Sequence, residues 1–332
     1  MKTLSRIFVL LLLFLTVKTY ATHIVGGVMY YRYLGGTSYE ITMKIYRDCD
    51  PGVNTGFDGG LNRDGTLAPE LLISIFRESD NALIDNIVSI TPTITRVNPV
   101  ITNPCLIPTD ICVEEGVYVF TITLPNTTDG YYISYLRCCR NNSIDNIVTP
   151  GDVGSTVTVR IPPISTQLNN NAIFTNFPPI FICQNAPLLF DHSATDLDGD
   201  SLYYELCNPL NGLDNVTPTA SAGDPRCVGP YVPITFLGPY TSSNPLGTPT
   251  PPAVPITIDP NTGLLYGTPP NIGQFVVGVC VTEFRGGVPI CRTMRDFQFN
   301  VVNCPNPTAS IPSFNIDPVS YTHLTLPTKR IV

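Results

Sequence analysis

Residues 39–46 of this chain read YEITMKIY, a stretch in which apolar and polar side chains alternate. Successive side chains of a β-strand point to opposite faces of a sheet, so a period of two predicts a strand with one buried face. The apolar face consists of Tyr39, Ile41, Met43 and Ile45, and the polar face of Glu40, Thr42 and Lys44. The rest of the chain repeats this pattern.

Alternation of the same kind recurs, and no long stretch holds a helical period. In VYVFTITL, residues 117–124, one face carries Tyr118, Phe120, Ile122 and Leu124; in STVTVRI, residues 155–161, it carries Val157, Val159 and Ile161. Further strands are expected at residues 27–34, 71–77, 131–136, 188–190, 202–206, 234–237, 256–258, 264–266, 275–281 and 294–302. With 33 Pro and 25 Gly as turn formers between them, these short strands predict an all-β fold of the β-sandwich type.

The Pro- and Asn-rich segment RIPPISTQLNNN, residues 160–171, interrupts the strand pattern and predicts a domain boundary. At 332 residues the chain has room for two ordinary domains. We therefore expect two β-sandwich domains in tandem, at residues 22–165 and 166–304. Residues 305–318 follow as a Pro- and Ser-containing linker.

Both ends of the chain look separate from these domains. Lys2 and Arg6, the apolar run 7–17 and the small-residue site at residues 19–21 predict a signal peptide over residues 1–21. The segment VSYTHLTLPT near the other end can be read as the translation of a transposase-type sequencing adapter. We interpret residues 319–332 as a non-native tail and expect the natural chain to continue past Pro318.

Composition narrows the class of protein further. Eleven cysteines in an exported chain indicate an oxidising compartment and disulfide bonds. The formal charge of −8 becomes −13, from 13 basic and 26 acidic residues, once the signal peptide and the tail are removed. Such a balance disfavours nucleic acid and anionic lipid as partners and tolerates cations. No stretch after the signal peptide is a transmembrane candidate.

One hairpin can be placed in register from its side chains. Residues 275–281 and 294–302 each carry an apolar face, made of Phe275, Val277, Val279 and Val281 and of Phe297, Phe299 and Val301. Both faces meet one core if residues 285–287 form a three-residue loop with Phe275 opposite Phe297. That register points Cys280 away from the core and Cys291 toward it, which disfavours a bridge between them.

The other cysteines allow several pairings. Cys105 and Cys112 bracket a short loop, so we expect them to pair, which leaves Cys49 for either Cys138 or Cys139 and one thiol over. The second half holds six cysteines, which allow 15 connectivities. They are Cys183, Cys207, Cys227, Cys280, Cys291 and Cys304. No CxxC or His-rich spacing supplies a zinc site.

Signals of catalysis are nearly absent from the sequence. It contains no GxSxG, HExxH, P-loop or dinucleotide-binding motif. Outside the tail, the histidines are His23 and His192. The vicinal Cys138–Cys139 pair is expected to be structural, and no pair of carboxylates is singled out for acid–base chemistry. We expect a protein that is not an enzyme.

The segment HSATDLDGDSLYY, residues 192–204, places Asp196, Asp198 and Asp200 on alternate positions. An Asx-rich turn whose carboxylates accept local N–H groups is the simpler interpretation. Three crowded carboxylates repel one another, however, and calcium prefers hard oxygen ligands of this kind. We predict a Ca²⁺ site at these aspartates, joined by Asp191 or Glu205, with Gly199 permitting the loop to curl.

Four long segments, residues 21–49, 135–148, 177–209 and 273–304, resemble the N-terminal module of gliding-motility-associated surface proteins of gliding bacteria. They begin ATHIVGGVMYYRY, YLRCCRNN, FPPIFICQNAP and GQFVVGVCVTEF. Proteins of this family often carry PKD-type (polycystic-kidney-disease) or other Ig-like repeats. The resemblance implies type IX secretion and a location at the cell surface or outside the cell, associated with the outer membrane. ATDLDGDSLYY is similar to the calcium-linked turn of cadherin-like repeats, and IDPNTGLLYGTP, residues 258–269, resembles an Ig-like repeat.

Together these features predict a disulfide-stapled pair of Ig-like or cadherin-like sandwiches in an exported surface protein. The expected role is adhesion or spacing in a gliding or surface assembly, with other surface proteins, glycans or further domains of the same longer chain as partners. The alternative is a carbohydrate-binding module of a larger secreted protein or hydrolase. In that case exposed tyrosines would stack on sugars, the candidates being Tyr30, Tyr31, Tyr131 and Tyr132.

Overall fold

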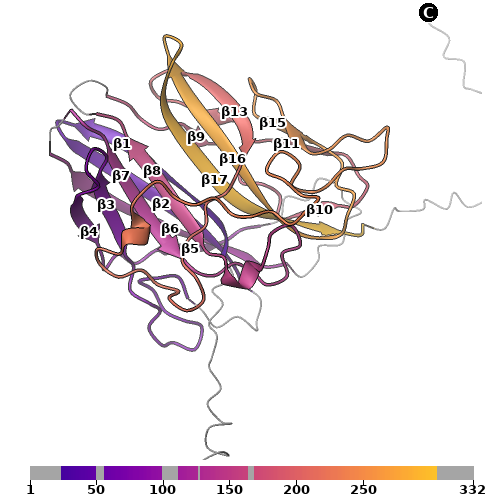
Figure 1. The fold of residues 1–332 in the computed structure, drawn as a ribbon, viewed down its shortest axis with the longest axis horizontal. Coiled ribbons are helices and arrows are strands. Elements are labelled where there is room, and N and C mark those ends of the chain that lie inside the picture. The colour runs from indigo at the N-terminus through magenta and orange to yellow at the C-terminus, as the bar shows by residue number, and fades with distance from the viewer. Residues whose placement is uncertain (1–23, 50–55, 99–110, 126–127, 164–167, 305–332) are drawn as a thin grey trace, which may run out of the picture.

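The computed structural model describes residues 24–49, 56–98, 111–125, 128–163 and 168–304, and within them the chain is all-β (Figure 1). The predicted signal peptide, linker and adapter-encoded tail lie outside these residues, as do His23 and Cys105. The strands of the first half are β1 (Ile24–Gly35), β2 (Ser38–Asp48), β3 (Ile73–Arg77), β4 (Leu83–Ile87), β5 (Thr93–Arg96), β6 (Val113–Thr123), β7 (Tyr131–Arg137) and β8 (Ser155–Ile161).

The strands of the second half are shorter at first and end in a long hairpin. They are β9 (Ile173–Phe174), β10 (Phe181–Cys183), β11 (Leu188–Asp191), β12 (Ala194–Thr195), β13 (Ser201–Cys207), β14 (Thr257–Ile258), β15 (Leu264–Gly267), β16 (Gly273–Arg285) and β17 (Val288–Val302). Two single turns of 3-10 helix, η1 (Pro150–Asp152) and η2 (Pro225–Cys227), complete the described elements. The strand expected at 234–237 is wrong, because Phe236 forms only an isolated bridge with Ile147.

One large sheet joins the two halves of the chain. Its strand order is β13-β16-β17-β1-β2-β6-β5, and β10 adds a parallel pairing to β17. The contact between the halves is the antiparallel pair of β1 and β17, where Gly27 lies opposite Asp296. At Gly26 an added Cβ would come within 2.0 Å of the Asp296 carbonyl oxygen, so this close approach requires glycine.

The first core lies between the β1, β2 and β6 part of this sheet and a second sheet of order β4-β3-β7-β8. The faces predicted from alternation are confirmed. All of their apolar side chains are buried here: Tyr39, Ile41, Met43, Ile45, Tyr118, Phe120, Ile122, Leu124, Val157, Val159 and Ile161. Two packed sheets with one apolar core form a β-sandwich.

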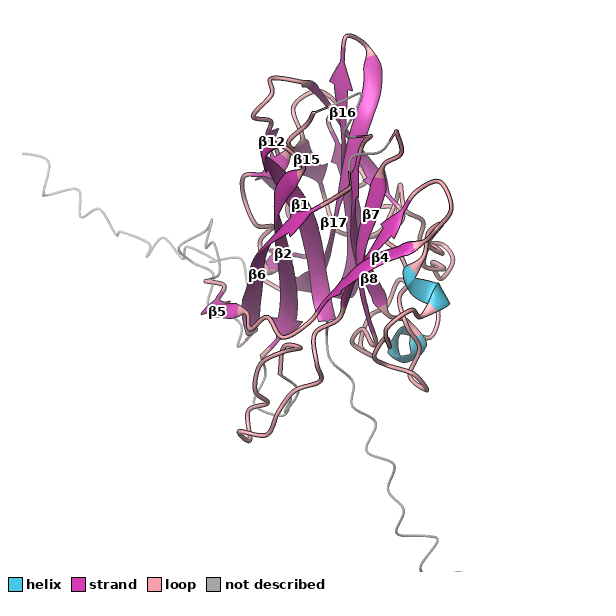
Figure 2. Cartoon of the chain, turned by 90° about the vertical axis from the view of Figure 1, so that its left-hand side faces the viewer, coloured by secondary structure: helices cyan, strands magenta, loops and turns pink. Residues whose placement is uncertain are grey.

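The second core lies on the opposite face of the large sheet. Val28 belongs to it whereas its neighbour Met29 belongs to the first core, and successive residues of a strand face opposite ways. Small sheets of order β11-β15-β14 and β12-β9 cover this core. Figure 2 shows the resulting layers, with β12 and β15 on one side of the large sheet and β4, β7 and β8 on the other.

The expected count of two tandem Ig-like domains is therefore not confirmed. Strands from both halves share the large sheet, and Asn171, at the end of the segment predicted to be a domain boundary, is bonded to β1 of that sheet. Asn171, which is fully buried, donates its backbone N–H to the Tyr31 carbonyl at 3.1 Å, and its Oδ1 accepts from the Tyr31 N–H at 3.0 Å. The Pro and Asn residues of this segment correctly predicted an interruption of the strands. They did not predict that Asn169 and Asn171 would be buried.

A fully buried ion pair fastens the halves where β1 meets β17. Arg140, which follows β7, donates Nη1 to Asp296 Oδ1 of β17 at 3.1 Å and also bonds Oδ2. The same guanidinium donates to the carbonyls of Gly154 at 2.9 Å and Leu210 at 3.3 Å. One side chain thus holds three segments and the large sheet together, and nothing in the sequence pattern pointed to it.

Four disulfides are present among the described cysteines: Cys49–Cys112, Cys138–Cys139, Cys183–Cys304 and Cys207–Cys280. The expected Cys105–Cys112 bond is wrong, as is the expected bond from Cys49 to the vicinal pair. The reason is strand pairing. Asp48 lies opposite Val113 in an antiparallel pair, so Cys49, just after Asp48, faces Cys112, just before Val113. Cys227 and Cys291 are buried free thiols.

The β16–β17 hairpin has the predicted faces but a different register. Phe275 lies opposite Phe299 rather than Phe297. The turn contains two residues, Gly286 and Gly287, both with positive φ. A bulge next to the turn shifts the pairing between Glu283 and Phe284. The shorter turn and the bulge each shift the register by one, so the parity is preserved. The predicted absence of a Cys280–Cys291 bridge is confirmed.

Candidate functional site

The aspartate-rich loop connects β12 to β13 and curls around one carboxylate. Asp196 Oδ1 accepts the backbone N–H groups of Asp198 at 2.9 Å and Asp200 at 3.0 Å. Gly199 between them has a φ of 78°, a left-handed conformation that glycine adopts without strain. Both the turn chemistry and the curl expected from the sequence are therefore present.

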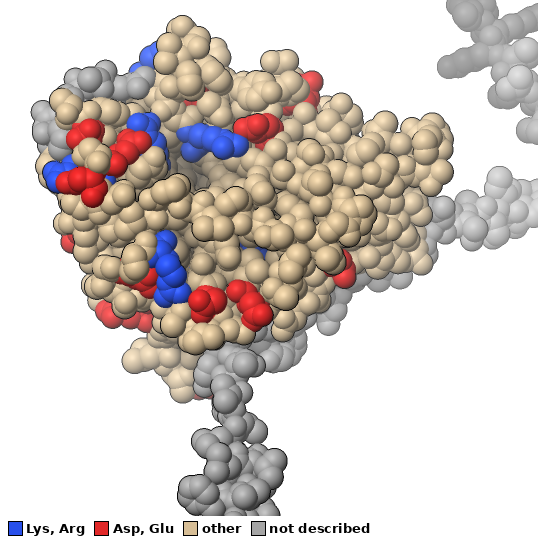
Figure 3. Space-filling view, viewed as in Figure 1, with Lys and Arg blue, Asp and Glu red and all other residues tan. Residues whose placement is uncertain are grey.

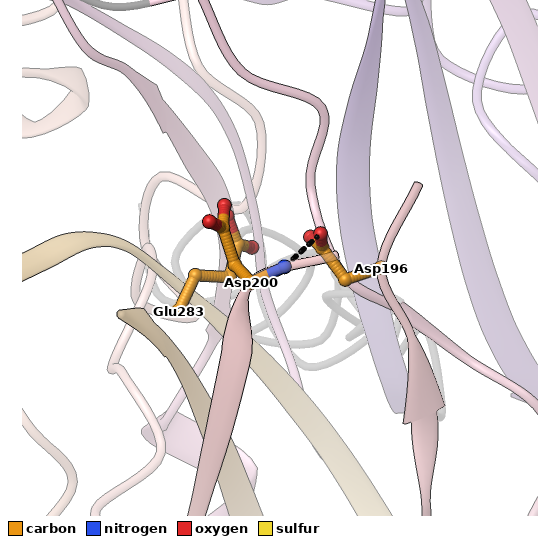
Figure 4. Close-up of side chains that lie close together, drawn as sticks. All are labelled: Asp196, Asp200 and Glu283. Atoms are coloured by element: carbon orange, nitrogen blue, oxygen red, sulfur yellow. Dashed lines mark hydrogen bonds between the residues drawn. The ribbon is translucent and has the colours of Figure 1, made fainter. Parts of the chain in front are cut away.

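Three carboxylates converge at this loop. One oxygen each from Asp196, Asp200 and Glu283 of β16 lies within 4.8 Å of the others (Figure 4). Two ligands of the same Ca²⁺ ion lie at most about 5 Å apart, because each bond is about 2.3–2.6 Å long. Asp196 Oδ2 is buried and has no hydrogen-bond partner among the described residues. An all-oxygen set with one unsatisfied buried oxygen fits a hard cation.

Asp198 and Asp200 already have a cationic partner. Arg285, at the end of β16, donates Nε to Asp200 Oδ1 at 2.8 Å and Nη2 to Asp200 Oδ2 at 2.7 Å. Its Nη2 also lies 3.3 Å from Asp198 Oδ2, and that carboxylate accepts two bonds from Asn170. Arg285 therefore compensates one side of the loop and leaves Asp196 and Glu283 on the other side without a basic partner among the described ion pairs.

Glu283 is the buried member of the group. Its carboxylate accepts from the Ala172 N–H at 2.7 Å and from the side-chain amides of Asn169 at 2.6 Å and Asn171 at 3.3 Å. Burial raises the pKa of Glu283, these hydrogen bonds lower it, and the nearby charge of Asp196 raises it further. A cation bound between Asp196 and Glu283 would relieve this repulsion.

The structure does not bring Asp198, Asp191 or Glu205 into this group. Asp191 Oδ1 accepts the Ser193 N–H at 3.0 Å, which makes a local turn. Glu205 lies on β13 and forms an exposed ion pair with Arg292 at 2.7 Å. Sequence reasoning missed Glu283 because it reaches the loop only through the β13–β16 pairing, in which Leu202 lies opposite Glu283.

The tyrosines named for sugar stacking divide between the interior and the surface. Tyr31 and Tyr131 are fully buried in the first core, whereas Tyr30 and Tyr132 are partly exposed. Tyr30 packs against the second core, which leaves Tyr132 at an open position on the outer face of the second sheet.

His192 is a buried core residue. Its ring lies 5.0–5.5 Å, centroid to centroid, from those of Phe174, Phe190 and Phe297. Neither ring nitrogen has a hydrogen-bond partner among the described residues, and burial lowers the pKa of His192 well below its usual value. The ring is therefore neutral at physiological pH, and it is inaccessible to solvent.

The fold and these clusters define a disulfide-linked, all-β protein with one acidic group able to hold a cation. The chain matches no family model, no curated protein and no solved structure in the comparisons made. Across the described residues, no helix is long and apolar enough to cross a membrane.

Proposed function

We propose that this chain is a non-enzymatic part of an exported surface protein, where it acts in adhesion or as a rigid spacer. The observation that carries this proposal is the shared sheet, which turns both halves into one continuous β-structure with a core on each face. A spacer must keep its ends in fixed relation, and a shared sheet resists hinge motion better than a flexible linker does.

The cysteines support the exported location. Eight of the ten described cysteines are in disulfides, which persist in oxidising compartments. The predicted signal peptide and the resemblance to gliding-motility-associated surface proteins agree with this location and favour export by the type IX route.

Surface display has a direct test in the source organism. Antibodies against the chain are expected to label intact cells or the culture medium, and protease added to intact cells is expected to remove the cell-bound signal. A cytoplasmic protein serves as the control, since it must stay protected until the cells are lysed. Protection of this chain together with the control would contradict the proposal.

We further propose that the loop at Asp196 and Asp200 binds Ca²⁺, with Glu283 as the third protein ligand. The buried, unpartnered Asp196 Oδ2 supports this proposal, because leaving a buried oxygen unsatisfied costs free energy that a cation would recover. Three carboxylate oxygens are fewer than the six to eight that calcium prefers, so backbone carbonyls or water would complete the shell.

Calcium is expected to stabilise the folded chain. At a hundredfold excess over its dissociation constant the gain is about 2.7 kcal/mol, which corresponds to a melting temperature about 5 °C higher for a protein of this size. An affinity on the order of 10⁻⁴–10⁻³ M, as in other extracellular modules, sets the concentration range. Melting curves in EDTA and in excess calcium measure the shift.

The Asp196→Asn variant is expected to lose most of this response, whereas Asp191→Asn, outside the group, keeps it. Equal shifts in wild type and Asp196→Asn would mean that the aspartates form only a turn.

A further inference from the structure

A small cavity of about 370 Å³ opens on the outer face of the β4-β3-β7-β8 sheet. The segment that follows β13 folds back over this face, and its residues Leu213 and Cys227 pack against Phe76 of β3 and Leu136 of β7. The cavity lies where this covering segment meets the sheet. Its lining consists of Glu78, Asn81, Tyr132, Gly229, Pro230 and Tyr231.

The two tyrosines of the cavity are held in place by their own hydroxyl groups. Tyr132 donates its hydroxyl to Glu78 Oε1 at 3.0 Å, and Tyr231 donates to the Cys227 carbonyl at 3.2 Å. Both side chains are only partly buried. Rings that are fixed before a ligand arrives lose little conformational entropy on binding, which favours affinity.

The polar groups of the cavity are close to charge balance. Glu78 is bound by Arg160, which donates Nε at 2.9 Å and Nη2 at 2.8 Å, so the carboxylate presents little uncompensated charge. Asn81 is exposed and has a φ of 57°, and its side-chain amide makes no hydrogen bond with the described residues. That amide can both donate to and accept from a ligand.

These features together select a ligand class. Aromatic rings favour a ligand with an apolar face, and the amide and the compensated carboxylate favour hydroxyl groups at its edge. A net charge of −8 disfavours anionic ligands. On the face of the molecule shown in Figure 3, charged side chains gather in small groups separated by broad uncharged areas. Pyranose rings combine apolar C–H faces with hydroxyl edges.

We infer that this cavity binds a neutral saccharide, with Tyr132 and Tyr231 as the aromatic contacts and Asn81 as a hydrogen-bonding contact. A volume of about 370 Å³ is at the lower end for ligand sites, which fits one or two sugar rings. The inference depends on the proposed surface role for its biological meaning, since a glycan site would give an adhesive module its ligand. The binding itself is a property of the purified chain and is tested separately from its location.

The test is titration of the purified chain with glucose, galactose, mannose and N-acetylglucosamine and their disaccharides, followed by NMR or calorimetry. A ligand of about twelve non-hydrogen atoms at the efficiency of drug-sized ligands binds with a dissociation constant on the order of 1 mM. We expect at least one neutral sugar to saturate in this range and glucuronic acid to bind at least tenfold more weakly. Binding of no neutral sugar, or of glucuronic acid alone, would overturn the inference.

Variants then locate the site. Tyr132→Ala is expected to weaken binding about tenfold, which is the effect of losing about 1.4 kcal/mol of aromatic contact. Asn81→Gly keeps the left-handed backbone and removes only the amide, and is expected to weaken binding severalfold. Tyr203→Ala, at an exposed position outside the cavity, is the matched control and is expected to bind as wild type. If Asn81→Gly and a folded Tyr132→Ala both bind as wild type does, the cavity is not the saccharide site.

Discussion

Replacing Cys207 and Cys280 together by alanine is expected to lower the free energy of unfolding by about 4 kcal/mol. The bridge joins β13, at the edge of the large sheet, to β16 and closes a loop of 73 residues. In the chain-entropy model, opening a loop of that length raises the conformational entropy of the unfolded chain, which stabilises the unfolded state by about 4 kcal/mol. A shift of that size corresponds to a melting temperature about 7 °C lower for a protein of this size.

Thermal or denaturant unfolding of the double variant measures the effect, and Cys227→Ala is the matched control. Cys227 is a buried cysteine without a disulfide, so its replacement removes a small side chain and no cross-link. In wild type, a reductant whose action is confirmed by mass is expected to lower the melting temperature further, because it opens all the bridges. Unchanged melting after complete reduction would show that the cross-links do not stabilise the native state.

The bridges also mark the limit of what the sequence could predict. Alternation of side chains predicted the buried faces of β2, β6 and β8 correctly, because this information is local. It does not say which strands are neighbours. Cys49 and Cys112 meet only because β2 pairs with β6, whereas the short loop between Cys105 and Cys112 favours a local bridge from the sequence alone.

The missed strands have a physical reason of their own. β4 and β5 carry few buried side chains, and β9, β10 and β12 are two or three residues long. An exposed or very short strand needs no apolar face, so its sequence shows no alternation. Such strands are defined by hydrogen bonds to a neighbouring strand rather than by the burial of one face.

The acidic site also contains residues that the sequence could predict and residues that it could not. Asp196 and Asp200 could be named from the sequence because a single curled loop brings them together around Gly199. Glu283 and Arg285 lie on β16 and reach the loop through strand pairing. No local sequence pattern indicates the tyrosine cavity. Tyr132 and Tyr231 come together only because the segment following β13 folds over the second sheet.

A buried ion pair reinforces the large sheet where β1 meets β17. β1 and β17 pair at one registered position, Gly27 with Asp296, and the two cores on opposite faces of the sheet both contain side chains from β1 and β17. Arg140 and Asp296 lie at this seam between β1 and β17 and are almost completely inaccessible to solvent. Ser155 adds a hydrogen bond to Asp296 Oδ2 at 3.2 Å, so the carboxylate has partners from two segments.

Arg140→Met is therefore expected to destabilise the protein by about 3–5 kcal/mol. Removing one partner of a buried ion pair leaves the other charge desolvated and uncompensated, here the Asp296 carboxylate. The carbonyls of Gly154 and Leu210 lose their donor at the same time. Methionine retains much of the side-chain volume, so the loss reflects the polar contacts more than a cavity. Urea unfolding, with the slope compared between variants, measures the change.

A double-mutant cycle separates the ion pair from the other contacts of Arg140. Asp296→Leu alone is expected to be strongly destabilising, because it leaves the Arg140 guanidinium buried without its counter-charge. The variant with both Arg140→Met and Asp296→Leu is expected to be more stable than the sum of the two losses predicts, by a coupling energy of about 1–3 kcal/mol. Arg292→Met is the control, because Arg292 lies on β17, the strand that carries Asp296. The ion pair of Arg292 with Glu205 is exposed, and such pairs contribute about 0–1 kcal/mol to stability. Additive losses at Arg140 and Asp296, or an effect of Arg140→Met no larger than that of Arg292→Met, would show that the seam does not depend on this pair.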